Sequence, residues 1–303
     1  MAAKRVVIVA NKWWEADPLC GVLIHDRARP ASLTNFRFLH YPAPRVQKPK
    51  PGEPRPPDPK AEPRLTFDCP GASVEVWCIE ELMNPAENSS SSLEKSRVLG
   101  GAINYGATPD LVVAFGTASA PSEVSANGSV TIGRRVFIHD PRADAPDRTG
   151  LWTPPKPDQL IESALPAQAL TRLDEQARYA AEARFMTSPV EPAAPPVTVI
   201  SNGLVALGVV NITSYDDYIW ADAEAMEEFH TNVATAQIGS IETTHGVIRS
   251  ASESPFLYVS GIANSEGLFD YQVTPRVYAQ NFVAAHNAAL TLAWLLPSLA
   301  AAL

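Results

Sequence analysis

The sequence of 303 residues has few cysteines and no excess of basic residues, and each shortage excludes a class of protein. Its three cysteines, none in Cys-x-x-Cys spacing, are too few for a disulfide framework. Lys and Arg number 24 against 33 Asp and Glu, so the formal net charge is −9 and the pI is about 5.2. This balance argues against a nucleic-acid-binding surface. We therefore expect a reduced compartment and no nucleic-acid partner.

Long hydrophobic runs are also absent. Val6 to Ala10, behind a briefly basic start, is too short for the apolar core of a signal peptide. The apolar stretch from Phe282 to Leu303 is interrupted by His286, Asn287 and Pro297, and its longest unbroken part is shorter than the roughly 20 residues that span a bilayer. We expect a buried helix there, no membrane partner, and a cytoplasmic protein.

Several common catalytic motifs are missing. The sequence contains no G-x-x-x-x-G-K-[ST], G-x-G-x-x-G, G-x-S-x-G or H-E-x-x-H, so the simplest interpretations as an NTPase, dinucleotide enzyme, serine esterase or zincin are excluded. Glu242 and His245 form one E-x-x-H at helical spacing, but a di-metal bundle needs two such motifs and further carboxylates. We expect no metal site and no cofactor.

Short runs rich in β-branched residues alternate with helical patterns through most of the chain. This alternation predicts an α/β fold, a single domain over residues 1–303 whose mostly parallel or mixed central sheet is flanked by helices. Expected strands are Val6 to Ala10, Val74 to Ile79, Leu111 to Phe115, Val130 to Phe137, Leu204 to Ile212 and Phe256 to Val259. Expected helices are one behind a Ser91/Glu94 capping box, two over Ala221 to Arg249 separated near Gly239, and one over Tyr278 to Leu296.

Two regions interrupt this alternation. Residues 42–63 contain nine prolines among charged residues, which predicts an extended surface insertion between the first and second strands. Residues 141–196 are similarly irregular and predict a second insertion with one amphipathic helix, within Ala167 to Phe185.

Polar and small residues follow two of the expected strands. Gly116-Thr117-Ala118-Ser119 follows Leu111 to Phe115, and Ser214-Tyr215-Asp216-Asp217-Tyr218 follows Leu204 to Ile212. Ligands of open α/β sheets bind at the carboxyl ends of the strands, so both segments are candidate binding loops. An ordinary turn and helix-capping aspartates are the alternative interpretations.

Five segments occur in a characteristic order. They are Val112-Val113-Ala114-Phe115-Gly116-Thr117-Ala118, Gly128-Ser129-Val130-Thr131-Ile132-Gly133 with Val136 to Asp140, Ser214 to Ile219, Ser240-Ile241-Glu242-Thr243, and Pro255 to Asn264. Together they resemble the purine-nucleoside and uridine phosphorylase superfamily, which includes the adenosylhomocysteine-type nucleosidases. The resemblance covers residues 5 to 20 and 72 to 300, outside both insertions. It implies a nucleoside phosphorylase-like fold and an enzyme that cleaves N-glycosidic bonds.

The resemblance also implies roles for individual residues. Glu242, at the expected start of a helix, would hold the ribose hydroxyls, Glu15 would orient the attacking water, and Asn264 stands where the family usually has an aspartate that contacts the base. Ile241 would pack under the sugar and Tyr218 would stack on the base. The other expected substrate-binding residues are Gly116, Thr117, Ala118, Ser119, Ser214, Asp216 and Ile219. A small-molecule nucleoside or free base is the implied partner, and a homo-oligomer the implied assembly.

Two departures from the family pattern bear on the reaction. Phosphorylases commonly end the strand before the glycine with an arginine that grips phosphate, and this chain has Ala114 there, so hydrolysis fits better than phosphorolysis. Asn264 cannot act as a general acid at neutral pH, although it can donate to and accept from a base. Two alternatives stay open. One is a phosphorylase that binds phosphate through Thr117, Ser119 and Arg134 or Arg135 of a neighbouring subunit. The other is a non-catalytic nucleoside-binding or interaction protein.

Overall fold

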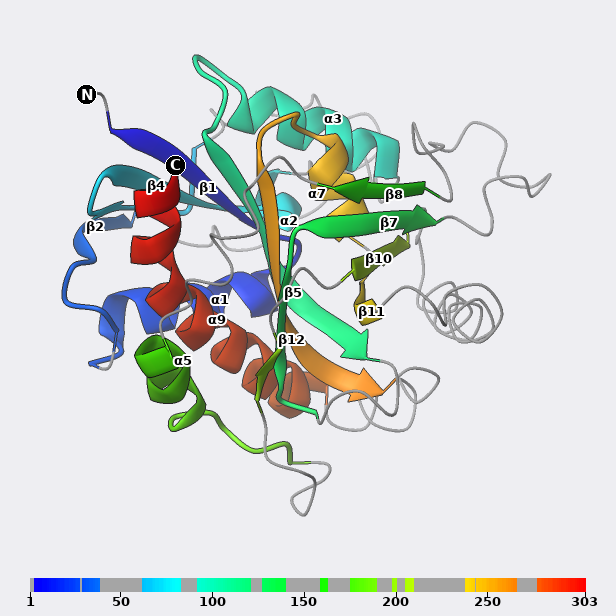
Figure 1. Cartoon of the computed structure of the whole chain (residues 1–303). Coiled ribbons are helices and arrows are strands. Elements are labelled where there is room, and N and C mark those ends of the chain that lie inside the picture. The colour runs from blue at the N-terminus through cyan, green and yellow to red at the C-terminus, as the bar shows by residue number, and fades with distance from the viewer. Residues whose placement is uncertain are drawn as a thin grey trace, which may run out of the picture.

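A computed structural model describes residues 3–27, 29–38, 62–82, 92–120, 127–139, 159–162, 175–189, 198–200, 205–209, 238–242, 244–265 and 277–303. In these residues one mixed, mostly parallel sheet is flanked by helices, which confirms the predicted fold class (Figure 1). Its strands are β1 (Lys4–Ala10), β2 (Thr34–Phe38), β3 (Leu65–Cys69), β4 (Ala72–Cys78), β5 (Leu111–Ala120), β6 (Val130–Gly133), β7 (Arg135–His139), β8 (Gln159–Glu162), β9 (Val199–Ile200), β10 (Val205–Val209), β11 (Ile238–Glu242) and β12 (Phe256–Ser265). The helices are α1 (Trp13–His25), α2 (Ile79–Leu82), α3 (Ser92–Ile103), α5 (Glu175–Glu182), α7 (His245–Ser250) and α9 (Val277–Ala302).

Strand β5 lies at the centre of this sheet and has three neighbours. β12 runs parallel to it along one edge, from Phe256 opposite Val112 to Ser265 opposite Ala120. β1 pairs with the first half of the other edge and leaves the sheet at Ala10, opposite Phe115. β11 then occupies the second half of that edge as an antiparallel partner, so the sheet is mixed at this point.

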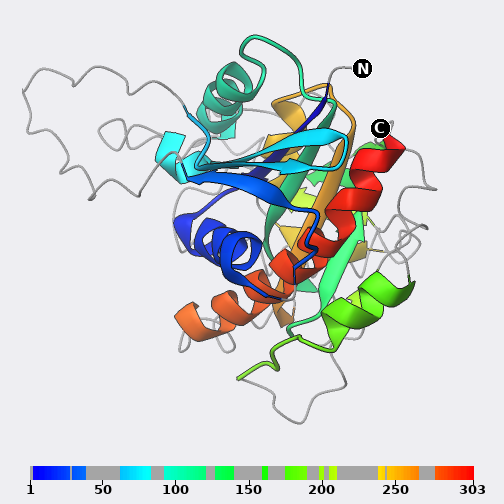
Figure 2. The same ribbon diagram turned by 90° about the vertical axis from the view of Figure 1, so that its left-hand side faces the viewer.

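Two apolar layers enclose the sheet, because successive residues of a strand face opposite sides. Val6 and Ile8 of β1 belong to a large cluster that includes buried residues of α1 and α9, whereas Val7 and Val9 face a smaller cluster under α3 and α7. Figure 2 shows α1 and α9 side by side on one face of the sheet. The almost continuously apolar sequence of β5 and β12 follows from this burial on both faces.

Several predicted elements are confirmed with altered bounds. β5 and β12 lie side by side as predicted, but each continues five or more residues beyond its expected end, so Gly116 to Ser119 belong to a strand and not to a turn. The expected strand Val130 to Phe137 is two strands that break at Arg134, because β6 pairs with β12 and β7 with β10. The last helix extends to Ala302, past Pro297.

The prediction of two helices over Ala221 to Arg249 is wrong at its centre. Residues 238–242 form β11, which pairs with β10 and β5, and the short helix α7 begins only at His245. Tertiary pairing in the sheet overrides the helical spacing of this segment. Residues 221–237, the Pro-rich residues 42–61 and most of 141–196 lie outside the described residues; within the last region, the expected helix is present as α5 over Glu175–Glu182.

Helix α9 is long and apolar enough to cross a membrane by length and composition, over Ala279–Ala302. Within the fold, however, 72% of the apolar 18-residue window of this helix is buried, and α9 packs against α1 and β12. The prediction of a buried core helix is therefore confirmed.

One glycine permits this packing. A Cβ built at Gly261 of β12 would lie 1.9 Å from the backbone oxygen of Ala284 in α9, a distance that no side chain can occupy. The helix backbone therefore rests directly on the strand that carries Asn264.

We expect Gly261→Ala to lower the free energy of unfolding by about 3 kcal/mol, because α9 must move away from the sheet to admit the methyl group. Gly101→Ala in α3 is the matched control, since a Cβ there meets nothing within 4 Å and should stabilise the helix by up to about 1 kcal/mol. Urea unfolding of the two variants measures both effects. Equal stability of the two variants would contradict the close approach of α9 and β12.

Candidate active site

Three residues far apart in sequence meet beside the second half of β5. Ser119 of β5 lies opposite Asn264 of β12 on one side and opposite Ile241 of β11 on the other. Glu242 follows Ile241 directly. α1, which begins three residues after the end of β1, brings Glu15 to the same strand, where Glu15 contacts Thr117. Strand register and the position of α1 together gather two acids and an amide.

Glu15 is only 3% exposed, and both of its carboxylate oxygens accept hydrogen bonds from the protein. Its Oε2 accepts the backbone N–H of Lys12 at 3.0 Å and so caps α1. Its Oε1 accepts the backbone N–H of Thr117 at 2.8 Å and the Thr117 hydroxyl at 3.1 Å. A Cβ at Gly116 would lie 2.8 Å from this oxygen, so glycine there leaves room for the carboxylate.

Glu242 ends β11 and is 5% exposed. Its Oε2 accepts the backbone N–H groups of Thr244 and of His245, the latter at 2.5 Å. The first N–H groups of a helix have no acceptor within that helix, so the Glu242 carboxylate caps the amino end of α7. Glu242 is thus a buried strand-end carboxylate, and the expectation that it starts a helix is wrong.

Burial raises the pKa of both carboxyl groups. The pKa of Glu15 rises to about 7, first because burial removes water and second because Glu242 lies nearby with the same charge. The pKa of Glu242 also rises to about 7 through burial, against the opposing effect of the Thr244 and His245 N–H groups and of the Lys95 cation. Near neutral pH each acid can therefore both accept and release a proton, as a general base must.

Asn264 is 1% exposed, and two hydrogen bonds from its amide nitrogen fix the orientation of its side chain. Nδ2 donates to the Ser119 hydroxyl at 2.8 Å and to the backbone oxygen of Ser265 at 2.9 Å. Both amide hydrogens are thereby used, and the oxygen Oδ1 is the group left for a ligand.

His245 is buried beside Glu242, with Nε2 3.9 Å from Oε2 of the acid and Nδ1 3.4 Å from the Ser260 hydroxyl. Burial lowers its pKa to about 3, so the ring is neutral at physiological pH. Within the part of the chain that the structure describes, no group of three or more His, Cys, Asp or Glu could hold a metal ion.

The structure brings together most of the expected site residues that it describes. Thr117 and Ser119 project to one face of β5 and bind Glu15 and Asn264, whereas Ala118 packs on the other face with Ala120 and Ile262. Ile241 is buried opposite Ser119. Four expected residues lie outside the described residues, namely Ser214, Asp216, Tyr218 and Ile219.

Arg134 and Arg135 do not lie at this end of the sheet. Arg135 pairs with Val205 at the start of β10, whereas Glu242 pairs with Gly208 near its end. The two arginines are therefore at the amino end of these parallel strands, away from the acids of their own chain.

Sequence reasoning missed the basic residues around the acids. Lys12 forms an ion pair with Glu80 at 3.5 Å, and Lys95 interacts electrostatically with both Glu15 and Glu242. Arg64, 2% exposed, binds Asp17 of α1 and Glu81 of α2 and so ties together the helices that flank the site. None of these residues belongs to a recognisable motif, and only their positions in the fold reveal them.

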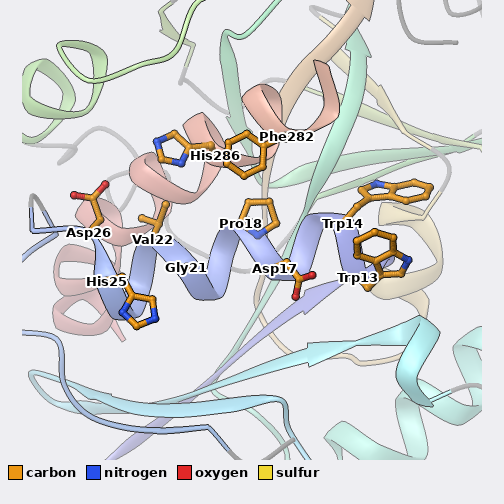
Figure 3. Close-up of a pocket in the computed structure, with 10 residues that line it drawn as sticks. All are labelled: Trp13, Trp14, Asp17, Pro18, Gly21, Val22, His25, Asp26, Phe282 and His286. Carbon is orange, nitrogen blue, oxygen red and sulfur yellow. The ribbon is translucent and has the colours of Figure 1, made fainter. Parts of the chain in front are cut away.

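A separate groove of about 570 Å³ lies between α1 and α9 (Figure 3). Trp13 and Trp14 line one end of it at the start of α1, and His25 and Asp26 line the other. Glu15 follows the tryptophans in sequence but is not part of the lining, because its carboxylate binds Thr117.

Solved structures of nucleosidases share this fold. The 5′-methylthioadenosine/S-adenosylhomocysteine nucleosidase of Colwellia psychrerythraea, in complex with adenine, has a TM-score of 0.54 and 12% identity over 98% of this chain and 96% of its own. The enzyme of the same name from Neisseria meningitidis, with methylthio-immucillin-A, has a TM-score of 0.52 and 14% identity over 97% and 99%. Futalosine hydrolase of Helicobacter pylori has a TM-score of 0.53 and 10% identity over 97% of each chain.

No protein-family model matches the sequence, and no curated protein matches it significantly. At such low identities the structural likeness establishes the fold. It confirms the nucleoside phosphorylase-like architecture that the five sequence segments predicted.

The raised pKa values have a consequence for stability. An acid with a pKa of about 7 in the folded chain and 4.5 in the unfolded chain carries no ionisation cost well below pH 4.5, where it is protonated in both states, and it destabilises the fold increasingly as the pH rises to 7. Glu242→Gln removes this pH-dependent destabilisation. We expect the variant to be more stable than the native chain at pH 8, by a few kcal/mol at most, and to differ little at pH 4.5. Thermal unfolding at the two pH values tests this, and a variant less stable at pH 8 than at pH 4.5, relative to the native chain, would contradict it.

Proposed function

We propose that the protein is a nucleosidase, which uses water to cleave the N-glycosidic bond between a ribose and a base. The observation that carries the proposal is the meeting of Glu15, Glu242 and Asn264 beside one strand, with two carboxylates buried although burial opposes their ionisation. Perturbed acids that converge in this way are typical of catalytic sites. The nucleosidase structures that share the fold support the same reaction class.

The chemistry matches these groups. As the bond from C1′ to the base nitrogen breaks, its electron pair leaves with the base and positive charge builds on the sugar. Ionised Glu242 stabilises this cation and accepts hydrogen bonds from the ribose hydroxyls. Glu15 accepts a proton from the water whose oxygen bonds to C1′. The departing base takes its proton from solvent, because the Asn264 amide has none to give.

Phosphorolysis has less support. Ala114 stands where a phosphate-binding arginine would be, the Thr117 hydroxyl already donates to Glu15, and the Ser119 hydroxyl already accepts from Asn264. Arg134 and Arg135 could serve only from a neighbouring subunit, since they lie at the far end of their own strands.

A panel of nucleosides, incubated with and without phosphate and analysed for free base, tests the proposal. We expect release without phosphate. Glu242→Gln should lower kcat by about 10²-fold or more, as loss of a preorganised electrostatic partner does. Glu253→Gln is the matched control, because Glu253 is exposed before the amino end of β12, away from the acids.

Each other outcome selects an alternative. Release that requires phosphate would make the protein a phosphorylase. Binding of nucleosides without any release would make it a non-catalytic binding protein.

Asn264 also suggests a preference among bases. Because both of its amide hydrogens are bound within the protein, it can offer only the oxygen Oδ1 to a base, and that oxygen needs a donor. A 6-aminopurine supplies one, whereas the carbonyl of a 6-oxopurine would place two acceptors against each other. We expect kcat/KM for adenosine-type substrates to exceed that for the matched inosine-type substrates by at least about tenfold. Steady-state kinetics on matched pairs measures the ratio, and preference for the oxo base would mean that the Asn264 amide is turned the other way.

A further inference from the structure

Lys95 is a half-buried lysine on the first turn of α3. Within the described residues, no carboxylate lies within 4.0 Å of its ammonium group. Its charge nevertheless interacts with Lys12, Glu242, Glu80 and Glu15, and burial lowers its pKa to about 8. Lys95 is therefore cationic at neutral pH, and its charge interacts with both site acids.

The position of α3 explains this arrangement. α3 packs against α2 and α7 and lies beside both (Figure 1). The first turn of α7 holds Glu242 through its N–H groups. On the other side, Glu80 of α2 binds the backbone N–H of Trp13 at 3.2 Å, and so lies at the amino end of the helix that carries Glu15. α3 thus contacts α7, whose first turn holds Glu242, and α2, whose Glu80 binds the start of the helix that carries Glu15.

The other described charged groups near α3 already have partners. Glu80 is paired with Lys12, Glu81 with Arg64, and Arg5 with Glu75 at 2.8 Å. On α7, His245 is neutral and Arg249 donates to the backbone oxygen of Ser252 at 2.7 Å. Of the described charged groups in this region, Glu15 and Glu242 lack a cation in contact with them, and Lys95 lacks a carboxylate.

We propose that Lys95 is a positioning residue that keeps the Glu15 and Glu242 pair ionised for hydrolysis. The inference rests on the proposed function, because hydrolysis requires Glu242 as an anion and Glu15 as a base. A lysine in contact with one acid would neutralise that acid and occupy its oxygens. Lys95 acts on both acids through its charge, without an ion-pair contact among the described residues, and leaves their hydrogen bonds unchanged.

The acidic limb of the pH–rate profile measures this effect. Lys95→Met removes a cation that interacts with two buried carboxylates, so the pH at which kcat/KM falls to half should rise by about one unit. Activity at pH values well above this limb should be largely retained. Lys95→Arg should restore the native limb, because arginine supplies a permanent cation from the same helix position. Lys95→Gln provides a second neutral variant if the methionine variant folds poorly.

Lys4→Met is the matched control. Lys4 forms an ion pair with Asp110 at 3.3 Å at the amino end of β1, so its loss changes the net charge equally without approaching the acids. The profile of this variant should equal the native one. If Lys4→Met moves the limb as far as Lys95→Met does, the effect is one of overall charge and the proposal fails.

A titration without substrate separates this inference from the proposed function. Carbon-13 NMR of labelled glutamate carboxyl groups follows Glu15 and Glu242 in the free protein, with Glu15→Gln and Glu242→Gln used to assign the signals. We expect both titrations to move to higher pH in Lys95→Met and to return in Lys95→Arg. If the protein cleaves no nucleoside but the titrations move, the proposed function fails and the electrostatic role of Lys95 stands. Unchanged titrations, or a fall in activity at every pH with an unmoved limb, would overturn the role of Lys95.

Discussion

The structure depends on a difference in length between two paired strands. β1 leaves the sheet at Ala10, opposite Phe115, while β5 continues to Ala120. The vacated edge of β5 is filled by β11, and β12 covers the opposite edge along its whole length. α1, β11 and β12 therefore all converge beside residues 117–119. A longer β1 would occupy the place of β11, and the two acids could not meet.

This convergence works against stability. Glu15 and Glu242 are both nearly inaccessible to water, lie close enough to repel each other, and have pKa values near 7 in consequence. Hydrogen bonds from Lys12, Thr117, Thr244 and His245 compensate only part of the cost of burial. Elsewhere the fold fixes the flanking helices firmly, through Arg64 and through the contact of α9 with Gly261. A functional site that lowers stability, within a fold that is stabilised elsewhere, is a common arrangement in enzymes.

The sequence predicts the fold well because its signals are local and repeated. The apolar runs at β1, β5 and β12 are long enough to identify buried strands, and the order of five segments identifies the architecture. The sequence does not identify β11, because Ile238–Glu242 is short and becomes a strand only by pairing with β5 and β10. The family resemblance points to Glu242, but the burial of this residue depends on that pairing. Lys95 could not be found at all, since its importance comes from the packing of α3 over α2 and α7 and not from any pattern in sequence.

A crystal structure with a C-nucleoside, whose C1′–C bond resists hydrolysis, tests the central claim most directly. The account predicts that the ribose hydroxyls contact the Glu242 carboxylate, that Oδ1 of Asn264 accepts a hydrogen bond from the base, and that a water bound to Glu15 faces C1′. A nucleoside bound instead in the groove between α1 and α9, with both acids remote from its sugar, would contradict the account.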